Sequence, residues 1–270
     1  MKGENEEKEE DAVKDIRDAL GPYGHTVAIQ IFDTLDSTNS LAKSRADEAF
    51  PALYIARSQT AGRGRLGRSF HSPAHTGLYM TVAYTTVEPL TEAVRVTALA
   101  SVAAVSAIEE LTDKRPSIKW VNDIYLDGYK IGGILTEAVT LEEGMHRMVV
   151  GIGINLTTTE FPEGLRAPAS CLFDQSEAHK ATTAFADRLA GAITRRLLEA
   201  VEGIAFPEDC LQIYREHLCY VGTKVFCTRG HESFEGILLG VDNDYSLLVS
   251  AGGETLALSS GEVSVRPAVL

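Results

Sequence analysis

The chain has 270 residues, 44% of them hydrophobic, with 25 Lys and Arg against 38 Asp and Glu and a formal net charge of −13. This length fits one large domain, or a large and a small one, with a core that needs no metal or disulfide. The acidic balance argues against a general nucleic-acid or membrane binder, and no apolar run reaches the roughly 18 residues of a membrane span.

The N-terminus is polar and acidic. Its first ten residues, MKGENEEKEE, exclude a secretion signal and are expected to form a solvated tail. The spacing of Ala12, Ile16 and Leu20 then allows a short helix, which Gly21-Pro22 would end. We expect residues 1–20 to be an acidic tail or a short helix.

The central part of the chain alternates between strand and helix signals. The apolar pattern predicts strands over 27–32, 53–56, 77–84, 118–121, 129–137 and 148–156. It predicts helices over 39–49, 92–111, 182–202 and 207–218. Asp127-Gly128 is a strong hairpin signal.

The pattern changes after Cys219. Short strands separated by turns are predicted over 224–227, 234–241, 246–250, 255–258 and 263–266. Short strands at this spacing suggest a small β-barrel. We therefore expect a larger domain over residues 21–218 and a small one over 219–270.

The segment Ser58–Ser72 has no hydrophobic period and is rich in glycine and arginine. Gly62, Gly64 and Gly67 satisfy G-x-G-x-x-G, but Pro73 stops the helix that a dinucleotide site requires. Glycines let backbone N–H groups approach an anion, and arginines supply forked donors for phosphate oxygens. The segment therefore predicts a small-molecule phosphate site, with a solvated loop or an RNA-binding segment as the alternatives.

A second motif runs Lys119-Trp120-Val121-Asn122-Asp123 and is followed by Lys130-Ile131-Gly132-Gly133. A lysine can stabilise charge that develops during acyl activation, and an aspartate can hold Mg²⁺ through water. Taken alone, these residues are better explained as turn residues around a core tryptophan.

Two shorter patterns also favour a ligand site. Ser37-Thr38-Asn39 offers small polar groups at a helix start, although a plain N-cap explains them alone. Gly151 and Gly153 lie inside a predicted strand that ends on Asn155, and interior glycines weaken a strand unless a ligand or backbone comes close.

Neither histidines nor cysteines form a metal site. His71 and His75 are separated by Pro73, which breaks the helix that would align them. The four cysteines lack C-x-x-C or zinc-ligand spacing and are interpreted as free thiols in a reducing cytoplasm.

The ordered set of motifs resembles the biotin–protein ligases over most of residues 27–160, and the predicted C-terminal barrel resembles that family's last domain. The resemblance implies a mixed α+β fold, with a largely antiparallel sheet flanked by helices, like class II synthetases, and a C-terminal SH3-like β-barrel. It implies a cytoplasmic enzyme that makes biotinyl-5′-AMP from biotin and MgATP. The adenylate would then acylate one lysine of a biotin carboxyl carrier protein domain.

The resemblance also implies roles for individual residues. The catalytic residues would be Lys130, Arg65, Asp123 and Lys119. Biotin would contact Ser37, Thr38, Asn39, Gln59, Gly62, Arg63, Lys130, Gly133, Gly151 and Gly153. ATP would contact Arg63, Gly64, Arg65, Gly67, Arg68, Phe70, Asn122 and Asn155. The loop over residues 62–71 would be mobile without ligand and would close over the adenylate to exclude water.

Three departures from the family pattern stand out. Phe70 replaces the usual tryptophan after the loop and offers a smaller but similar ring face for adenine. Val121 replaces the usual proline. Only about 26 residues, with more acids than bases, precede the first strand, so we expect no DNA-binding domain of the kind that many bacterial members carry.

Other classes remain as alternatives. A lipoate or octanoate ligase shares the architecture, a biotin or nucleotide sensor would bind without catalysis, and an RNA-binding protein could use the Arg-Gly loop. The metal ligands and the oligomeric state, with a homodimer as one alternative, stay open.

Overall fold

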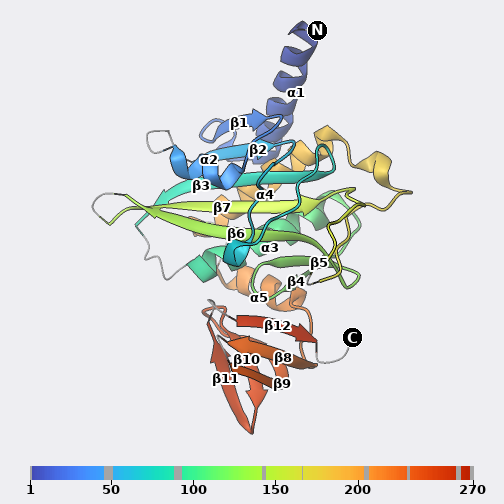
Figure 1. The fold of residues 1–270 in the computed structure, drawn as a ribbon. Coiled ribbons are helices and arrows are strands. Elements are labelled where there is room, and N and C mark those ends of the chain that lie inside the picture. Colours follow the sequence, from blue (N-terminus) through green and yellow to red (C-terminus); the bar gives the residue numbers. More distant parts are fainter. Residues whose placement is uncertain are drawn as a thin grey trace.

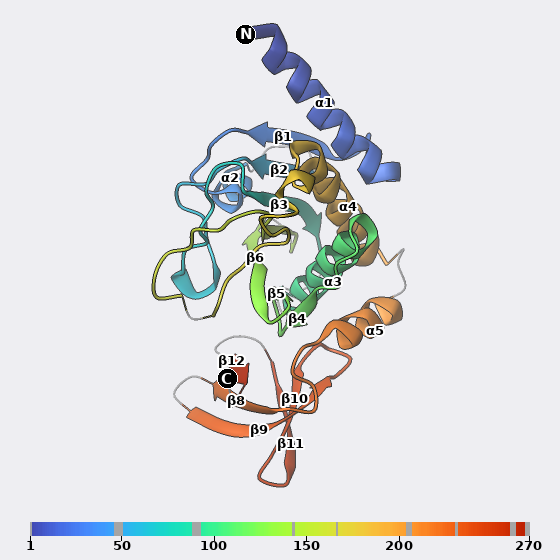
Figure 2. The same cartoon turned by 90° about the vertical axis from the view of Figure 1, so that its right-hand side faces the viewer.

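The computed structural model describes residues 2–45, 51–87, 93–141, 144–165, 167–203, 207–229, 232–259 and 263–267. It contains a large sheet with helices on both faces and, beyond α5, a second, smaller sheet (Figures 1 and 2). None of the described helices is long and apolar enough to cross a membrane.

The large sheet has seven strands in the order β1-β2-β3-β7-β6-β5-β4. The strands are β1 (Ala28–Phe32), β2 (Ala52–Ala56), β3 (Gly77–Thr86), β4 (Ser117–Lys119), β5 (Asp123–Leu126), β6 (Tyr129–Thr140) and β7 (His146–Asn155). Only β1 and β2 pair in parallel; the other neighbours are antiparallel. The expected mixed, largely antiparallel sheet is confirmed.

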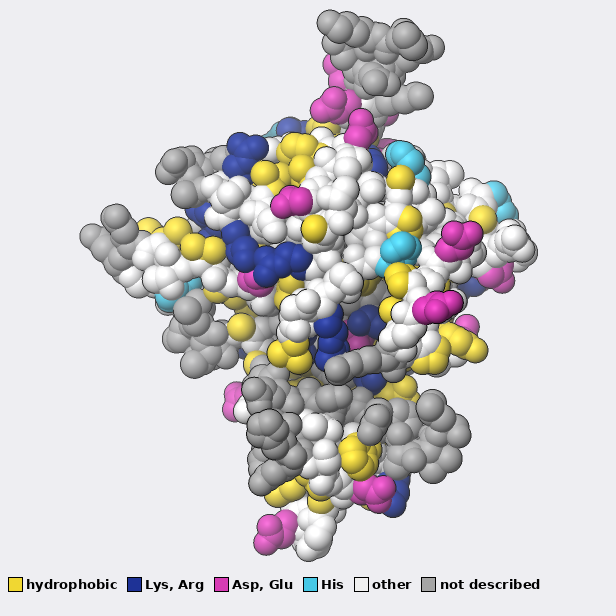
Figure 3. Space-filling view, in the orientation of Figure 1, with side chains coloured by type: hydrophobic (Ala, Val, Ile, Leu, Met, Phe, Trp, Pro, Cys, Tyr) yellow, Lys and Arg dark blue, Asp and Glu magenta, His cyan; other side chains and the backbone are white. Residues whose placement is uncertain are grey.

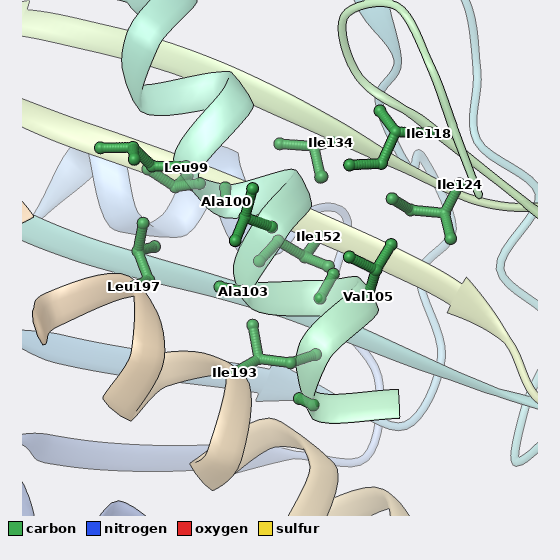
Figure 4. Packing of buried hydrophobic residues seen from close by; sticks show 14 of the residues in the cluster. Leu99, Ala100, Ala103, Val105, Ile118, Ile124, Ile134, Ile152, Ile193 and Leu197 are labelled. Carbon is green, nitrogen blue, oxygen red and sulfur yellow. The ribbon is translucent and has the colours of Figure 1, made fainter. Parts of the chain in front are cut away.

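Five α-helices accompany this sheet: α1 (Lys2–Leu20), α2 (Thr38–Ser44), α3 (Ala93–Leu111), α4 (Thr183–Val201) and α5 (Pro207–His217). Helices α3 and α4 pack on one face, where Ile134 and Ile152 meet Ala103 and Ile193 (Figure 4). Helix α2 packs on the opposite face, against β2, β3 and β7. Beside α2, none of the other described helices packs on this second face.

Helix α1 begins at Lys2, so residues 2–10 belong to a helix, where the sequence suggested a solvated tail. Its buried residues include Ala12, Ile16 and Leu20, which face α4. A β carbon on Gly191 of α4 would lie 2.5 Å from the Ile16 carbonyl oxygen, so this glycine allows the two helices to approach closely. Tertiary packing therefore supports a helix that the acidic sequence obscures.

The C-terminal sheet has the order β11-β10-β9-β8-β12. Its strands are β8 (Lys224–Arg229), β9 (Glu232–Val241), β10 (Leu247–Ala251), β11 (Glu254–Leu258) and β12 (Val263–Pro267). The expected closure into a barrel is not confirmed, because within the described residues β11 pairs only with β10 and β12 only with β8, which leaves the sheet open. The indole N–H of Trp120 donates to the Tyr245 carbonyl oxygen at 2.8 Å and joins the two sheets.

Candidate functional site

The open face of the large sheet carries residues from four neighbouring strands. Gly133 of β6 lies opposite Gly153 of β7 and opposite Asp123 of β5, and Asp123 in turn lies opposite Lys119 of β4. Residues that face each other across a ladder point to the same side of a sheet. The ladder therefore gathers the two sequence motifs around Lys119 and Gly153 on one surface.

Lys130 reaches this surface through an irregularity in the sheet. The register of β5 on β6 shifts between Ile124 and Tyr125, so that Ile124 pairs with Gly132 while Tyr125 pairs with Lys130. In a regular strand, Lys130 and Gly133 would point to opposite faces; a β-bulge re-aims the side chain. A β carbon on Gly133 would lie 3.4 Å from the Lys130 Nζ, which shows that both face the site.

Three cations surround one carboxylate at the centre of this surface. The Lys130 Nζ donates to Asp123 Oδ1 at 2.5 Å. Burial lowers the pKa of Lys119, the charge of Asp123 raises it, and the charge of Lys130 lowers it again, so that the net pKa lies below the usual range. Burial likewise lowers the pKa of Arg65. Together with Asp123, Lys119, Lys130 and Arg65 leave a net positive charge, which suits a ligand that carries or develops negative charge.

A buried polar network lies at the start of α2. The backbone N–H and the hydroxyl of Thr38 donate to Gln59 Oε1 at 2.9 and 3.2 Å, and Gln59 Nε2 donates to the Ser72 hydroxyl at 3.0 Å. The Ser37 hydroxyl caps α2 by accepting from Ser40 N. The Thr38 hydroxyl oxygen also lies 2.8 Å from the Thr81 hydroxyl, so one of its lone pairs remains as an acceptor, and the hydrogen of Ser37 remains as a donor. This combination suits an amide- or urea-like head group.

Asn39 is held by the protein itself. Its Nδ2 donates to the Leu135 carbonyl oxygen at 3.2 Å and to Glu137 Oε2 at 3.0 Å, and its Oδ1 accepts from the Thr81 hydroxyl at 2.7 Å. A β carbon on Gly151 would lie 2.1 Å from Asn39 Oδ1. Gly151 therefore makes room for Asn39, and both amide hydrogens of Asn39 are used within the protein.

The Arg-Gly loop folds back on itself above the site. Gly64 N donates to the Arg68 carbonyl oxygen and Phe70 N to the Gly62 carbonyl oxygen, both at 2.8 Å. The tip is a 3₁₀ turn, η2 (Arg65–Gly67), with Leu66 and Gly67 at φ of 57° and 72°. Lys and Arg side chains gather in a band across the face shown in Figure 3. This band contrasts with the acidity of the whole chain.

Two loop arginines have protein acceptors. Arg65 Nη1 donates to Asn122 Oδ1 at 3.0 Å, and Arg63 Nη2 lies 3.1 Å from Glu137 Oε1. Arg68 is exposed at the tip. Side chains thus attach the loop to Asn122, just before β5, and to Glu137 of β6.

Phe70 closes the loop against β7. A β carbon on Gly153 would lie 2.5 Å from a Phe70 ring carbon, and Tyr79 meets the same ring edge-on, with centroids 6.4 Å apart. At the end of β7, Asn155 donates from Nδ2 to the Ser170 carbonyl oxygen at 3.0 Å, while its buried Oδ1 has no partner among the described residues. A buried acceptor without a partner is costly, so a ligand N–H group would be favourable there.

The sequence motifs did not single out Thr81, Ser72 or Glu137. Thr81 is a polar residue inside an apolar strand, and Glu137 lies four residues after Gly133, on the same face of β6. Both features can be read from the sequence, but neither points to a site unless the pairing register of the strands is known. The described residues contain no group of three or more His, Cys, Asp or Glu that could hold a metal ion.

Comparisons with known proteins agree with this architecture. The model of the Biotin/lipoate A/B protein ligase family matches residues 31–155. The chain is 30% identical over 221 residues to the bifunctional ligase/repressor BirA of Bacillus spizizenii, covering 80% of this chain and 67% of that protein. It is 29% identical over 216 residues to the biotin–[acetyl-CoA-carboxylase] ligase of Mycobacterium tuberculosis, covering 78% and 77%.

A solved structure, the biotin protein ligase from Aquifex aeolicus in complex with biotin and ATP, superposes with a TM-score of 0.70 at 26% identity. The match covers 89% of this chain and 99% of that chain.

Proposed function

Because this chain belongs to the biotin–protein ligases of the biotin/lipoate A/B protein ligase family, we propose that it converts biotin and ATP into biotinyl-5′-AMP and transfers the biotinyl group to a lysine. The acceptor lysine would belong to a biotin carboxyl carrier protein domain. The observation that carries the proposal is the cluster of Lys130, Asp123, Lys119 and Arg65, which lies under the Arg-Gly loop on the same face as the polar network of Thr38 and Gln59.

The polar network around Thr38 and Gln59 would bind the ureido group of biotin. Beyond its contact with Thr81, Thr38 keeps one acceptor lone pair for a ureido N–H, and Ser37 has a hydrogen for the ureido oxygen. Gln59 Nε2 keeps one hydrogen beyond its bond to Ser72. The valeryl chain would then run past Gly133, toward Lys130 and the other cations, while Gly151 and Gly153 make room for Asn39 and Phe70.

In the first half-reaction, a biotin carboxylate oxygen would attack the α-phosphorus of ATP, and the bond to pyrophosphate would break. Lys130 would contact both the carboxylate and the α-phosphate, and so would offset charge as they approach. Arg65 and Lys119 would stabilise the phosphates, and Asn122 would hold Arg65 until they arrive.

In the second half-reaction, the acceptor amine would attack the carbonyl carbon of the adenylate, an N–C bond would form, and AMP would leave. The amine loses one proton, which Asp123 would accept in its place beside Lys130. The adenine ring would lie against Phe70, with its amino group near Asn155 Oδ1. Gly62, Gly64 and Gly67 would let the loop close, with Arg63 and Arg68 near the ligands.

Mg²⁺ would enter with the nucleotide. Its usual ligands in such sites are phosphates, water and one or two carboxylates, and Asp123 is a carboxylate among the cations of this site. The residues present therefore fit a nucleotide-borne ion, which would screen phosphate charge. We also propose a catalytic domain over 21–218 and an SH3-like unit over 219–270, since α5 ends at His217 and β8 begins at Lys224.

The direct test is adenylate formation. The purified chain is incubated with MgATP and either biotin or lipoate, pyrophosphate release is followed, and the product is identified by mass spectrometry. Biotinyl-AMP, and then a carrier domain heavier by one biotinyl group, supports the proposal. Lipoyl-AMP would move the assignment to the lipoate ligases, and biotin binding without either product would indicate a sensor.

A further inference from the structure

Glu137 joins three elements that border the biotin pocket. Its Oε1 accepts from Lys43 Nζ of α2 at 2.8 Å and lies 3.1 Å from Arg63 Nη2 of the loop, and its Oε2 accepts from Asn39 Nδ2 at 3.0 Å. The side chain is 19% exposed. Burial raises the pKa of Glu137, but hydrogen bonds from Lys43 and Asn39 and the nearby cations outweigh it, so that the carboxyl stays ionised at neutral pH.

The two loop arginines that contact the sheet differ in their acceptors. Arg63 faces the ionised carboxylate of Glu137, whereas Arg65 faces the neutral amide oxygen of Asn122. Both donors are charged, but Arg63 and Glu137 form an ion pair at contact distance, whereas the charge of Asp123 acts on Arg65 from beyond the distance of a salt bridge. A phosphate that competes for both would therefore draw Arg65 away before Arg63.

We propose that Glu137 is a positioning residue that holds the Arg-Gly loop over the biotin pocket through Arg63 and fixes Asn39 at the same time. The Arg65 side chain then leaves Asn122 to bind phosphate, while the Arg63 side chain stays paired with Glu137 and keeps the loop in place. This inference rests on the proposed function, but the ion pair between Arg63 and Glu137 can be tested independently of that function.

The contact can be tested without activity, by limited trypsin cleavage after Arg63, Arg65 and Arg68. Glu137→Gln keeps the size of the side chain and an acceptor for Asn39 but removes the charge that holds Arg63. Cleavage in the loop should become up to about tenfold faster, since a partly exposed ion pair contributes at most a little over 1 kcal/mol and a factor of ten corresponds to about 1.4 kcal/mol. Arg63→Gln changes only a 40% exposed side chain and should accelerate cleavage after Arg65 and Arg68 in the same way.

Glu177 provides a matched control. Its side chain is 20% exposed and accepts from Lys114 and Lys180, but it makes no described contact with the loop. Glu177→Gln should leave the cleavage rate of the loop unchanged. Equal cleavage rates in wild type, Glu137→Gln and Arg63→Gln would overturn the proposal, as would acceleration by Glu177→Gln to the same extent.

Kinetics provides the second test. Glu137→Gln should raise KM for biotin by about tenfold, in line with the loss of one charge-assisted hydrogen bond, and change KM for ATP less. The double variant with Arg63→Gln should be no worse than the more impaired single variant, whereas additive losses would show that Glu137 does not act through Arg63. If the wild type makes no biotinyl-AMP, the proposed function fails, and the trypsin experiment still decides the role of Glu137.

Discussion

The ring of Phe70 lies against the backbone of Gly153 so closely that a β carbon at position 153 would come within 2.5 Å of a ring carbon. Gly153→Ala should therefore displace the ring from the surface proposed for adenine. We expect KM for ATP to rise by about tenfold, because stacking of a base on an aromatic ring contributes about 1–3 kcal/mol. Pyrophosphate release measured against ATP concentration gives this value.

The two residues should act as a pair. Phe70→Ala alone should raise KM for ATP to a similar degree, and adding Gly153→Ala to it should cost little more, because the overlapping ring is already gone. Fully additive losses would mean that Gly153 contacts the ligand independently of Phe70.

Lys130 should matter for rate far more than for stability. Lys130→Gln removes the cation proposed to bridge the carboxylate and the α-phosphate, and biotinyl-AMP formation should slow by about 10²–10³-fold. The ion pair with Asp123 is 30% and 22% exposed, so the free energy of unfolding should change by no more than about 1 kcal/mol.

Lys180→Gln is the matched control for Lys130. Lys180 also pairs with a carboxylate, that of Glu177, at 2.7 Å, but lies outside the proposed site. Adenylate formation should be unchanged in this variant. A similar loss of rate in both variants, or no loss in Lys130→Gln, would remove Lys130 from the catalytic residues.

Much of the fold follows from local sequence signals. The hairpin expected at Asp127-Gly128 joins β5 to β6, with both residues at positive φ (51° and 83°), as such a turn requires. Period-two alternation placed most strands of both sheets within a few residues of their ends. The open C-terminal sheet could not be foreseen, since closure depends on pairing between distant strands.

The sequence alone shows the motifs of the candidate site but not how their side chains are arranged in space. Lys130 reaches the face of Gly133 only through the register shift after Ile124, and no local pattern reports such a shift. Glu137 has no motif of its own and gains its importance from partners on α2 and the loop, far apart in the sequence. Contacts of this kind depend on tertiary structure.

Helix α1 depends on a close approach that can be tested at Gly191. A β carbon there would lie 2.5 Å from the Ile16 carbonyl oxygen and 2.7 Å from the Ala19 β carbon. Gly191→Val should destabilise the fold by about 1–3 kcal/mol, as overpacking usually does, and separate α1 from α4. Thermal unfolding and faster amide hydrogen exchange over Ala12–Leu20 would report both effects.

Ala184→Val is the control for Gly191→Val. It introduces the same β-branched residue into the same helix, at an exposed position. The melting temperature should change little, and exchange in α1 should not change. If Gly191→Val has no greater effect than Ala184→Val, α1 does not depend on this packing.

Lys119 should give the chain an opposed pH dependence of stability and activity. Burial is the largest cause that lowers its pKa, so the charged form is disfavoured in the folded state. The free-energy cost of burying the charged Lys119 is complete below the pKa of Lys119 in the folded state. It disappears as pH rises from that pKa toward about 10.4, the pKa of lysine in an unfolded chain. Stability should therefore rise with pH in that window relative to Lys119→Met, measured by denaturant unfolding.

Activity should move in the other direction. As Lys119 loses its proton, the cation proposed to face the phosphates disappears, and adenylate formation should fall at a lower pH than an ordinary lysine would allow. Lys119→Arg stays charged throughout this pH range, so the loss of adenylate formation at alkaline pH should occur at higher pH in this variant than in the wild type. Because the two proteins differ only at position 119, the difference between their pH profiles reports on Lys119. Coincident alkaline limbs would show that the charge of Lys119 does not support the reaction.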